Sequence, residues 1–368
     1  MRTVQEIIDH LESLAPSGAA ESWDNVGLLV GDPSWKTKGA IVSIDLTADA
    51  IQAALKKKFK LIVTHHPCIF PKGKGPSRIN AGPVFDALRA GIAVAAYHTN
   101  FDQCALEVVE HVSQGLKAQP MGRLVDEPHG SLLKLSVFVP ITHAESVRAA
   151  ICEAGAGHIG HYDFCTFATP GEGTFRGGNL TKPFLGKPGI LEKANEIRLE
   201  TVFPKGMEKK ILSALFKAHP YEEVAFDLYC LRQSPSAVGL VRGLGYGFWG
   251  KFPSPRPFSE VIKDVKSLFN IDGFWLTDPP PARIKKVAFV AGKGASFVEV
   301  AAAQGCELFI TGEAGYHTAL DGMRRGMAVM ELGHRESERF FLSTMKGWLS
   351  SAKLRAIELN KPTQRIRH

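Results

Sequence analysis

The first third of the chain alternates between segments with helical apolar spacing and short runs of consecutive apolar residues. Helices are predicted at residues 3–15, 48–57 and 82–90. Strands are predicted within residues 23–32 and at 40–45, 61–64 and 92–97. Because strands that alternate with helices form mostly parallel sheets covered by helices, we expect an α/β fold in this part of the chain.

The pattern changes near residue 125. Residues 132–139 alternate apolar and polar side chains, which is typical of a strand with one buried face. Helices are predicted at 143–154 and 207–217, further strands at 197–203 and 224–230, and a glycine-rich, polar stretch at about 168–190. Strands and helices in this order, within about 100 residues, fit a ferredoxin-like α+β unit.

From about residue 238 the first pattern returns. Helices are predicted at 258–269, 297–304 and 316–325, with strands at 286–290, 308–311 and 328–331, and a last helix that begins at His334. We therefore predict one α/β fold in two halves, residues 1–127 and 236–368, with an α+β domain inserted at 128–235.

Composition limits the class of protein. No apolar run approaches the roughly 18 residues of a membrane span, and the first residues lack the apolar core of a signal peptide, so we expect a cytoplasmic protein with no membrane partner. The six cysteines are scattered singly, which indicates thiols rather than disulfides or a zinc ribbon. The net charge of +7 permits an acidic ligand such as a nucleotide but does not by itself indicate nucleic-acid binding.

Two adjacent histidines end one of the predicted strands. His65 and His66 follow the apolar run Leu61–Thr64 and precede Pro67, which cannot continue a central strand. Where a strand ends the chain turns, so both imidazoles can reach one site, and strand ends in α/β sheets commonly carry ligand and metal sites. The alternative is a pair of ordinary loop histidines.

Similar residues follow other predicted strands. Asp102 comes after the strand at 92–97, whose end should lie on the same sheet edge. His334 and Glu338 are four apart at a helix start and share one face, although an exposed helical pair is the alternative. Imidazoles with carboxylates suit zinc, iron or manganese. Five such ligands predict a two-metal site with open positions for water, a kind of site that activates water near neutral pH.

Three further residues are candidates for supporting roles. His317, on a strand-end loop, could orient a substrate or act as an acid or base, or have no role in the site. We expect His98 to fix Asp102 by a hydrogen bond rather than to act as a sixth ligand. Asp45 is expected to cap the chain after its strand.

Five motifs carry a resemblance to a known family. They are WDNVGLLVGD at 23–32, THHP at 64–67, HTN-x-D at 98–102, TGEAGYH at 311–317 and GH-x-x-x-E at 333–338. In this order they resemble the Nif-three-like dinuclear metal-centre family, whose members are often labelled homologues of a type-two GTP cyclohydrolase I. The resemblance implies that His65, His66, Asp102, His334 and Glu338 bind two divalent metal ions, with Zn, Fe and Mn as candidates.

The resemblance also extends to the middle section. GAGHIGHY at 155–162, GTF at 173–175 and HPYEE at 219–223 are similar to the PII/CutA-like insertion of the longer bacterial members. Members of the family imply a homohexameric ring, a trimer of dimers, with metal sites that face an inner cavity.

Three classes of function follow from these observations. The first is a metal-dependent hydrolase that acts on a nucleotide or another phosphorylated small molecule, with GTP cyclohydrolase action implied only by the family label. The second is a non-catalytic metal-binding or regulatory hexamer, which the PII-like insertion favours. A nucleic-acid-binding ring is a third alternative, and it depends on the net charge and the implied ring.

Overall fold

The computed structural model describes residues 1–69, 81–126, 132–159, 162–231, 244–277 and 279–360. The chain divides into two compact units, of which one comprises Met1–Asp126 with Pro235–His368 and the other Glu127–Ser234. The predicted boundaries at 127/128 and 235/236, and positions 160–161 of the GAGHIGHY segment, lie outside the described residues. No helix within the described ranges has the length and apolar content of a membrane span.

The first sheet of the larger unit has five strands in the order β19-β4-β5-β6-β2. Their bounds are β2 Gly27–Val30, β4 Gly39–Ser43, β5 Leu61–Thr64, β6 Ala93–Ala96 and β19 Arg355–Glu358. All neighbours are parallel except β2, which pairs antiparallel with β6 at one edge. The strand at the other edge, β19, comes from the far end of the chain, so the first sheet is completed by the last strand.

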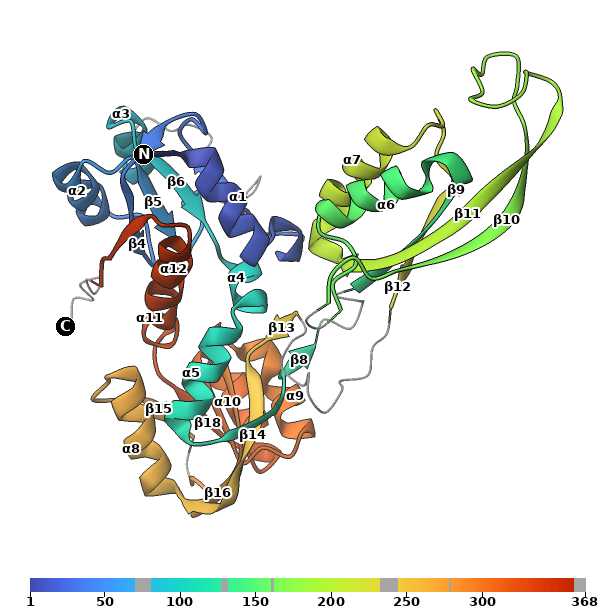
Figure 1. Cartoon of the computed structure of the whole chain (residues 1–368). Helices are drawn as coiled ribbons and strands as arrows, with labels where there is room; N and C mark the ends of the chain where they lie inside the picture. Colours follow the sequence, from blue (N-terminus) through green and yellow to red (C-terminus); the bar gives the residue numbers. More distant parts are fainter. Residues whose placement is uncertain (70–80, 127–131, 160–161, 232–243, 278, 361–368) are drawn as a thin grey trace. The chain divides into compact units, whose positions relative to one another are not determined.

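Helices cover both faces of this sheet (Figure 1). Val42 and Val63 point to a core shared with α1 (Val4–Leu14) and α12 (Phe340–Ser351). Ile41 and Ile62, one position earlier, point to a core on the opposite face. That core includes residues of α2 (Ala48–Lys57) and α3 (Pro83–Arg89). Burial of both faces explains why the strands are continuous apolar runs, and the prediction of a mostly parallel, helix-covered sheet is confirmed.

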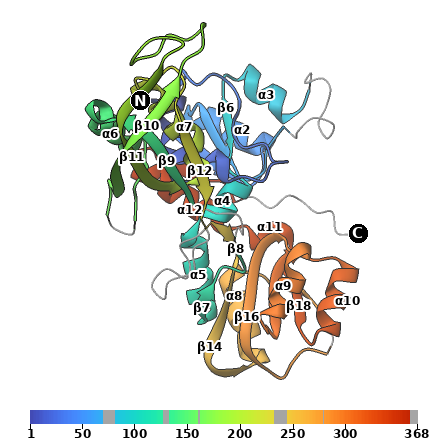
Figure 2. The ribbon, with the colours of Figure 1, turned by 90° about the vertical axis from the view of Figure 1, so that its right-hand side faces the viewer.

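The second sheet has six strands in the order β15-β18-β17-β16-β14-β7. Their bounds are β7 Gln119–Gly122, β14 Phe248–Pro257, β15 Trp275–Leu276, β16 Arg283–Lys293, β17 Leu308–Glu313 and β18 Ala328–Glu331. The three central strands are parallel. Figure 2 shows α8 on one face of the sheet and α9 with α10 on the other. Those helices are Phe258–Phe269, Val298–Ala303 and Tyr316–Arg324, and α5 (Leu106–Leu116) packs beside α8.

The sequence pattern did not indicate β7 or β14. In β14, Pro253, Pro255 and Pro257 read as a loop because proline donates no ladder hydrogen bond. The strand accommodates them by a register shift between Lys251 and Arg256 in its pairing with β16.

The two sheets bring the carboxyl ends of their parallel strands to one region. Asp45, His65 and His98 follow β4, β5 and β6 in the first sheet. In the second sheet, Glu313 ends β17, and His334 begins α11 (His334–Ser337) shortly after β18. Ligand sites in α/β sheets lie at such strand ends, and here two sheets contribute to one site.

The smaller unit has ferredoxin-like topology, as predicted. Its elements are β9 (Leu132–Pro140), α6 (Ala144–Glu153), β10 (Thr166–Arg176), β11 (Leu191–Pro204), α7 (Glu208–Ala218) and β12 (Phe226–Cys230). The antiparallel order is β10-β11-β9-β12, and both helices pack on one face. The first part of the glycine-rich stretch at 168–190 belongs to β10, whose edge position tolerates Pro170. The resemblance of this unit to PII and CutA domains stays a prediction.

Candidate metal centre

The backbone after β5 turns sharply and brings two imidazoles together. The His65 and His66 amides both donate to the Ile44 carbonyl, over 3.1 and 2.9 Å, and the Thr64 hydroxyl donates to the His66 carbonyl. These bonds hold the segment against the end of β4. The two rings lie 5.2 Å apart between centroids, so adjacent residues reach one cluster, as expected from their place at a strand end.

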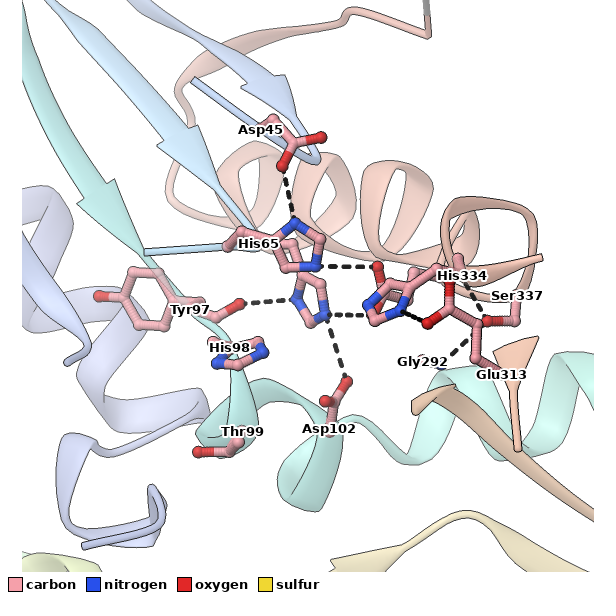
Figure 3. A network of polar contacts seen from close by, with 12 residues as sticks. Asp45, His65, Tyr97, His98, Thr99, Asp102, Gly292, Glu313, His334 and Ser337 are labelled. Carbon is pink, nitrogen blue, oxygen red and sulfur yellow. Dashed lines mark hydrogen bonds and ion pairs between the residues drawn. The ribbon is translucent and has the colours of Figure 1, made fainter. Parts of the chain in front are cut away.

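His65 is the buried centre of the cluster (Figure 3). Its Nδ1 lies 2.9 Å from the Tyr97 carbonyl oxygen. Because a carbonyl only accepts, Nδ1 carries a proton, and Nε2 is the nitrogen that can bind a further proton or a metal ion. That Nε2 faces Asp102 Oδ1 at 3.7 Å and Glu338 Oε1 at 3.5 Å and has no hydrogen-bond partner. Three electron-pair donors thus converge.

His66 is held in the same way. Its Nδ1 lies 2.7 Å from Asp45 Oδ1, and its Nε2 lies 3.1 Å from Glu338 Oε2. Asp45 was expected to be a structural cap, but the helix that follows is capped by Thr47, and the Asp45 carboxylate binds His66 instead. A carboxylate on Nδ1 fixes the ring orientation and makes Nε2 more basic.

His334 begins α11 and Glu338 directly follows its last residue, and the two side chains meet. His334 Nε2 lies 3.0 Å from Glu338 Oε1, while its Nδ1 faces Glu313 Oε2 at 3.4 Å. The Glu338 side chain is only 4% exposed, so the alternative of an exposed helical pair is wrong. Gly292 makes room for it, because a Cβ there would lie 2.6 Å from Glu338 Oε1, and its φ of +66° also favours glycine.

The cluster raises the pKa values of its histidines. Burial acts to lower the pKa of His66, but hydrogen bonds with Asp45 and Glu338 prevail and raise it to about 10. The pKa of His65 is also raised, because Asp102 and Glu338 outweigh the effect of burial. Burial acts to raise the pKa of Glu338, yet the nearby histidines hold it well below its usual range. In the metal-free protein, protons therefore balance the buried carboxylates.

A metal ion fits between these donor atoms. Ligands bound at about 2.0–2.2 Å to one ion, with tetrahedral or octahedral angles, lie roughly 3.0–3.5 Å apart. The distances from Nε2 atoms to carboxylate oxygens here are 3.0–3.7 Å. Nitrogen lone pairs that face carboxylates repel them unless a proton or a metal ion lies between, and each of the three imidazoles already has a partner on its Nδ1.

Two overlapping groups have ligand atoms close enough to hold an ion. One comprises His65, His66 and His98, and the other His66, His334 and Glu338, each within 4.8 Å. An imidazole Nε2 binds one ion, so His66 cannot serve both through that atom. Asp102 lies beside His65 at the edge of the first group. The residues therefore form a candidate metal centre, and the number of ions stays a prediction.

His98 differs from its expected role. Both Asp24 oxygens lie 3.0 Å from His98 Nδ1, so its carboxylate partner is Asp24 and not Asp102. Its ring also contacts those of His65 and His66, at 5.2 and 5.6 Å between centroids. This position is compatible with the sixth-ligand role that the sequence did not favour.

His317 lies on α10 with an exposed side chain. Its ring contacts that of Tyr316 at 5.3 Å. No interaction with the histidine cluster is present among the described residues, and a catalytic role for His317 stays a prediction.

Asp24 anchors the segment that carries His98, and its replacement should lower the stability of the fold. The carboxylate is 1% exposed and bonds His98, the Thr99 amide and hydroxyl, and the Asn25 amide. Burial acts to raise its pKa, but hydrogen bonds from His98 and Thr99 lower it to about 2. Asp24→Asn should lower the free energy of unfolding by about 1–3 kcal/mol in urea titrations at pH 7.

The stabilisation by the Asp24 carboxylate has a defined pH range. A lowered pKa stabilises the fold above the unfolded value of about 3.8, and this contribution is lost as the pH falls toward 2. The difference between Asp24→Asn and wild type should therefore shrink below about pH 4. The exposed Asp32 provides the control, since Asp32→Asn should change stability little. An equal loss in both variants would contradict the anchoring role.

Comparison with known proteins agrees with the motifs. Residues 2–364 match the family model described as Duf34/NIF3 (NGG1p interacting factor 3). A Bacillus subtilis (strain 168) protein named GTP cyclohydrolase 1 type 2 homolog is 36% identical over 332 residues, which cover 90% of this chain and 87% of that protein. A protein of the same name from Halalkalibacterium halodurans is 33% identical over 332 residues, covering 90% and 88%.

A solved structure has the same fold over the whole chain. The Bacillus cereus protein related to NIF3 superposes with a TM-score of 0.75 and 28% identity, covering 100% of this chain and 99% of that one. The match to the family model spans nearly the entire sequence and includes the five motifs. The chain therefore belongs to the DUF34/NIF3 family.

Proposed function

We propose that the chain is a metal-dependent hydrolase with a dinuclear centre, and that it acts on a nucleotide or another phosphoester. The proposed ligands are His65, His66, Asp102, His334 and Glu338. The observation that carries the proposal is the convergence of His65 Nε2 with two carboxylates, because such a buried arrangement needs a proton or a metal ion between the donor atoms.

The residues around the centre would prepare it for hydrolysis. Bound divalent metals lower the pKa of water and polarise phosphoryl or carbonyl oxygens. The Tyr97 carbonyl and the Asp45 carboxylate hold His65 and His66 in the tautomer that offers Nε2. Glu313, whose side chain is 45% exposed beside His334, can accept a proton from the reacting water and release it to solvent.

Charge favours an anionic substrate. Two divalent ions would bring four positive charges, and Asp102 and Glu338 would neutralise two of them at the ions, while the carboxylates of Asp24, Asp45 and Glu313 lie one imidazole farther away. The positive charge at the ions themselves suits a phosphate oxygen, since close opposite charges attract strongly in a partly buried site. Ring opening of GTP is compatible with this balance, but no described contact selects a purine, so we propose only the broader class.

Turnover by metal-loaded protein tests the proposal. Protein loaded separately with Mn, Fe or Zn would be offered nucleotides, including GTP, and simple phosphoesters. We expect hydrolysis that rises with bound metal, stops on chelation and is lost in Glu338→Gln. Metal-loaded protein that turns over none of these compounds would contradict the hydrolase proposal.

A second candidate function is a non-catalytic metal-binding assembly. The unit Glu127–Ser234 contributes none of the clustered side chains in the described part of the chain, which leaves a separate fold free for regulation or assembly. Under both proposed functions, we expect the protein to form a homohexamer, a trimer of dimers, in the cytoplasm. A nucleic-acid-binding ring would instead require steeply salt-dependent DNA binding. Light scattering of the intact protein tests the hexamer through its mass.

A further inference from the structure

A large aromatic side chain lies exposed beside the histidine cluster. Trp23 is 56% exposed, although a large apolar ring gains stability from burial. The indole makes a T-shaped contact with the His98 ring, at 6.1 Å between centroids. His98 in turn contacts His65 and His66, so Trp23 lies one imidazole away from the candidate metal ligands.

The turn that carries Trp23 is firmly anchored. The next residue, Asp24, binds His98 and Thr99, and its amide donates to the Glu21 carbonyl. On the other side, the Asn25 side-chain amide donates to the Ile69 carbonyl over 2.7 Å. The backbone on both sides of the indole is thus tied to the segments that follow β6 and β5. The ring is held at this position without being buried, which is the arrangement of a binding platform.

Trp23 lies beside one of the partly exposed imidazoles of the centre. The side chains of His65 and Glu338 are 1% and 4% exposed, whereas His98, His66 and His334 are 20%, 25% and 32% exposed. A ligand that reaches the buried donors from solvent therefore passes the partly exposed imidazoles, and His98 is the one that contacts Trp23.

From this arrangement we infer that Trp23 is a specificity-determining residue that stacks on a planar heteroaromatic ring of the substrate, such as a nucleobase. The inference rests on the proposed function, because the phosphate end of the same molecule would occupy the metal centre. Stacking on an aromatic side chain is tolerant of base identity. It therefore selects nucleotides over phosphoesters without a ring, and it does not discriminate strongly among nucleotides.

Equilibrium binding to the metal-loaded protein tests the inference. GMP and ribose 5-phosphate would be titrated calorimetrically into wild type, Trp23→Ala and Trp23→Phe. We expect Trp23→Ala to raise the Kd for GMP about 5- to 100-fold, as for the loss of one base-stacking contact. The Kd for ribose 5-phosphate and the metal content should not change, and Trp23→Phe should restore most of the GMP affinity.

A second exposed tryptophan provides the matched control. Trp275, on β15, is 81% exposed, and Trp275→Ala should bind GMP like wild type. Unchanged GMP affinity in Trp23→Ala would overturn the inference, as would equal weakening of both ligands. If wild type binds neither compound yet hydrolyses another phosphoester, the inference fails and the hydrolase proposal stands. If metal-loaded protein binds GMP through Trp23 but turns nothing over, only the hydrolase proposal fails.

Discussion

Replacement of Glu338 by glutamine is expected to abolish metal binding. The two carboxylate oxygens of Glu338 lie 3.0–3.5 Å from Nε2 of three histidines, so this side chain links every proposed ligand group except Asp102. Glutamine keeps the shape but removes the charge. Loss of a hydrogen-bonding partner of a ligand already costs about 10–100-fold in metal affinity, so loss of this ligand should cost more than about 100-fold. Metal analysis after dialysis measures the effect.

A matched control lies in α11, the short helix that ends directly before Glu338. Glu336 is two residues from Glu338, and in the part of the chain that the structure describes it has no ion pair with the clustered histidines. Glu336→Gln should retain wild-type metal content. His65→Ala should behave like Glu338→Gln, because it also removes a buried donor from the cluster. Wild-type metal content in Glu338→Gln or in His65→Ala would disprove the ligand assignment.

Metal affinity should rise steeply with pH. In the metal-free protein His66 has a pKa of about 10, so a metal must displace its proton at any pH below that value. For each proton displaced, the apparent Kd for Zn or Mn should fall about tenfold per pH unit between pH 6 and pH 9. Competition with a chelator of known affinity, at a series of pH values, measures this slope. A Kd that does not change with pH would show that the histidines are already deprotonated.

The raised pKa of His66 also predicts how the stability of the metal-free protein depends on pH. A histidine whose pKa is raised on folding contributes stability that is fully present below the unfolded value of 6.5 and is lost as the pH approaches 10. Chelator-treated protein should therefore melt at lower temperature at pH 9 than at pH 6.5, and metal-loaded protein should show a smaller drop. In Asp45→Asn, which lacks one of the two charged partners of His66, the drop should begin at lower pH.

Much of the fold could be predicted because its strands and helices have strong local signals. The runs that became β5 and β18 have the predicted bounds, and helix α8 also begins and ends as expected. Among the elements that escaped prediction, β7, β10 and β14 contain prolines or glycines that pairing with a neighbouring strand accommodates. Such pairing depends on distant segments, which no local pattern reveals.

The residues of the candidate site were likewise predicted only in part. The structure brings together His65, His66, His334 and Glu338, which strand-end position and helical spacing had marked. The groups that hold the histidines were missed or misassigned, because a hydrogen-bond partner depends on where the chain folds. They are Asp24, Asp45, Glu313 and the Tyr97 carbonyl. The only available signal was that three of them are acidic residues within the motifs or directly after a strand.

The place of β19 has a consequence for synthesis of the protein on the ribosome. Until residues Arg355–Glu358 have emerged, β4 is an edge strand with unpaired backbone groups. Open edges of this kind pair readily with other chains, and the whole smaller unit is translated while this edge is open. The nascent first half is therefore exposed to misassembly for most of translation. The proposed ligands His334 and Glu338 leave the ribosome only shortly before the edge is closed.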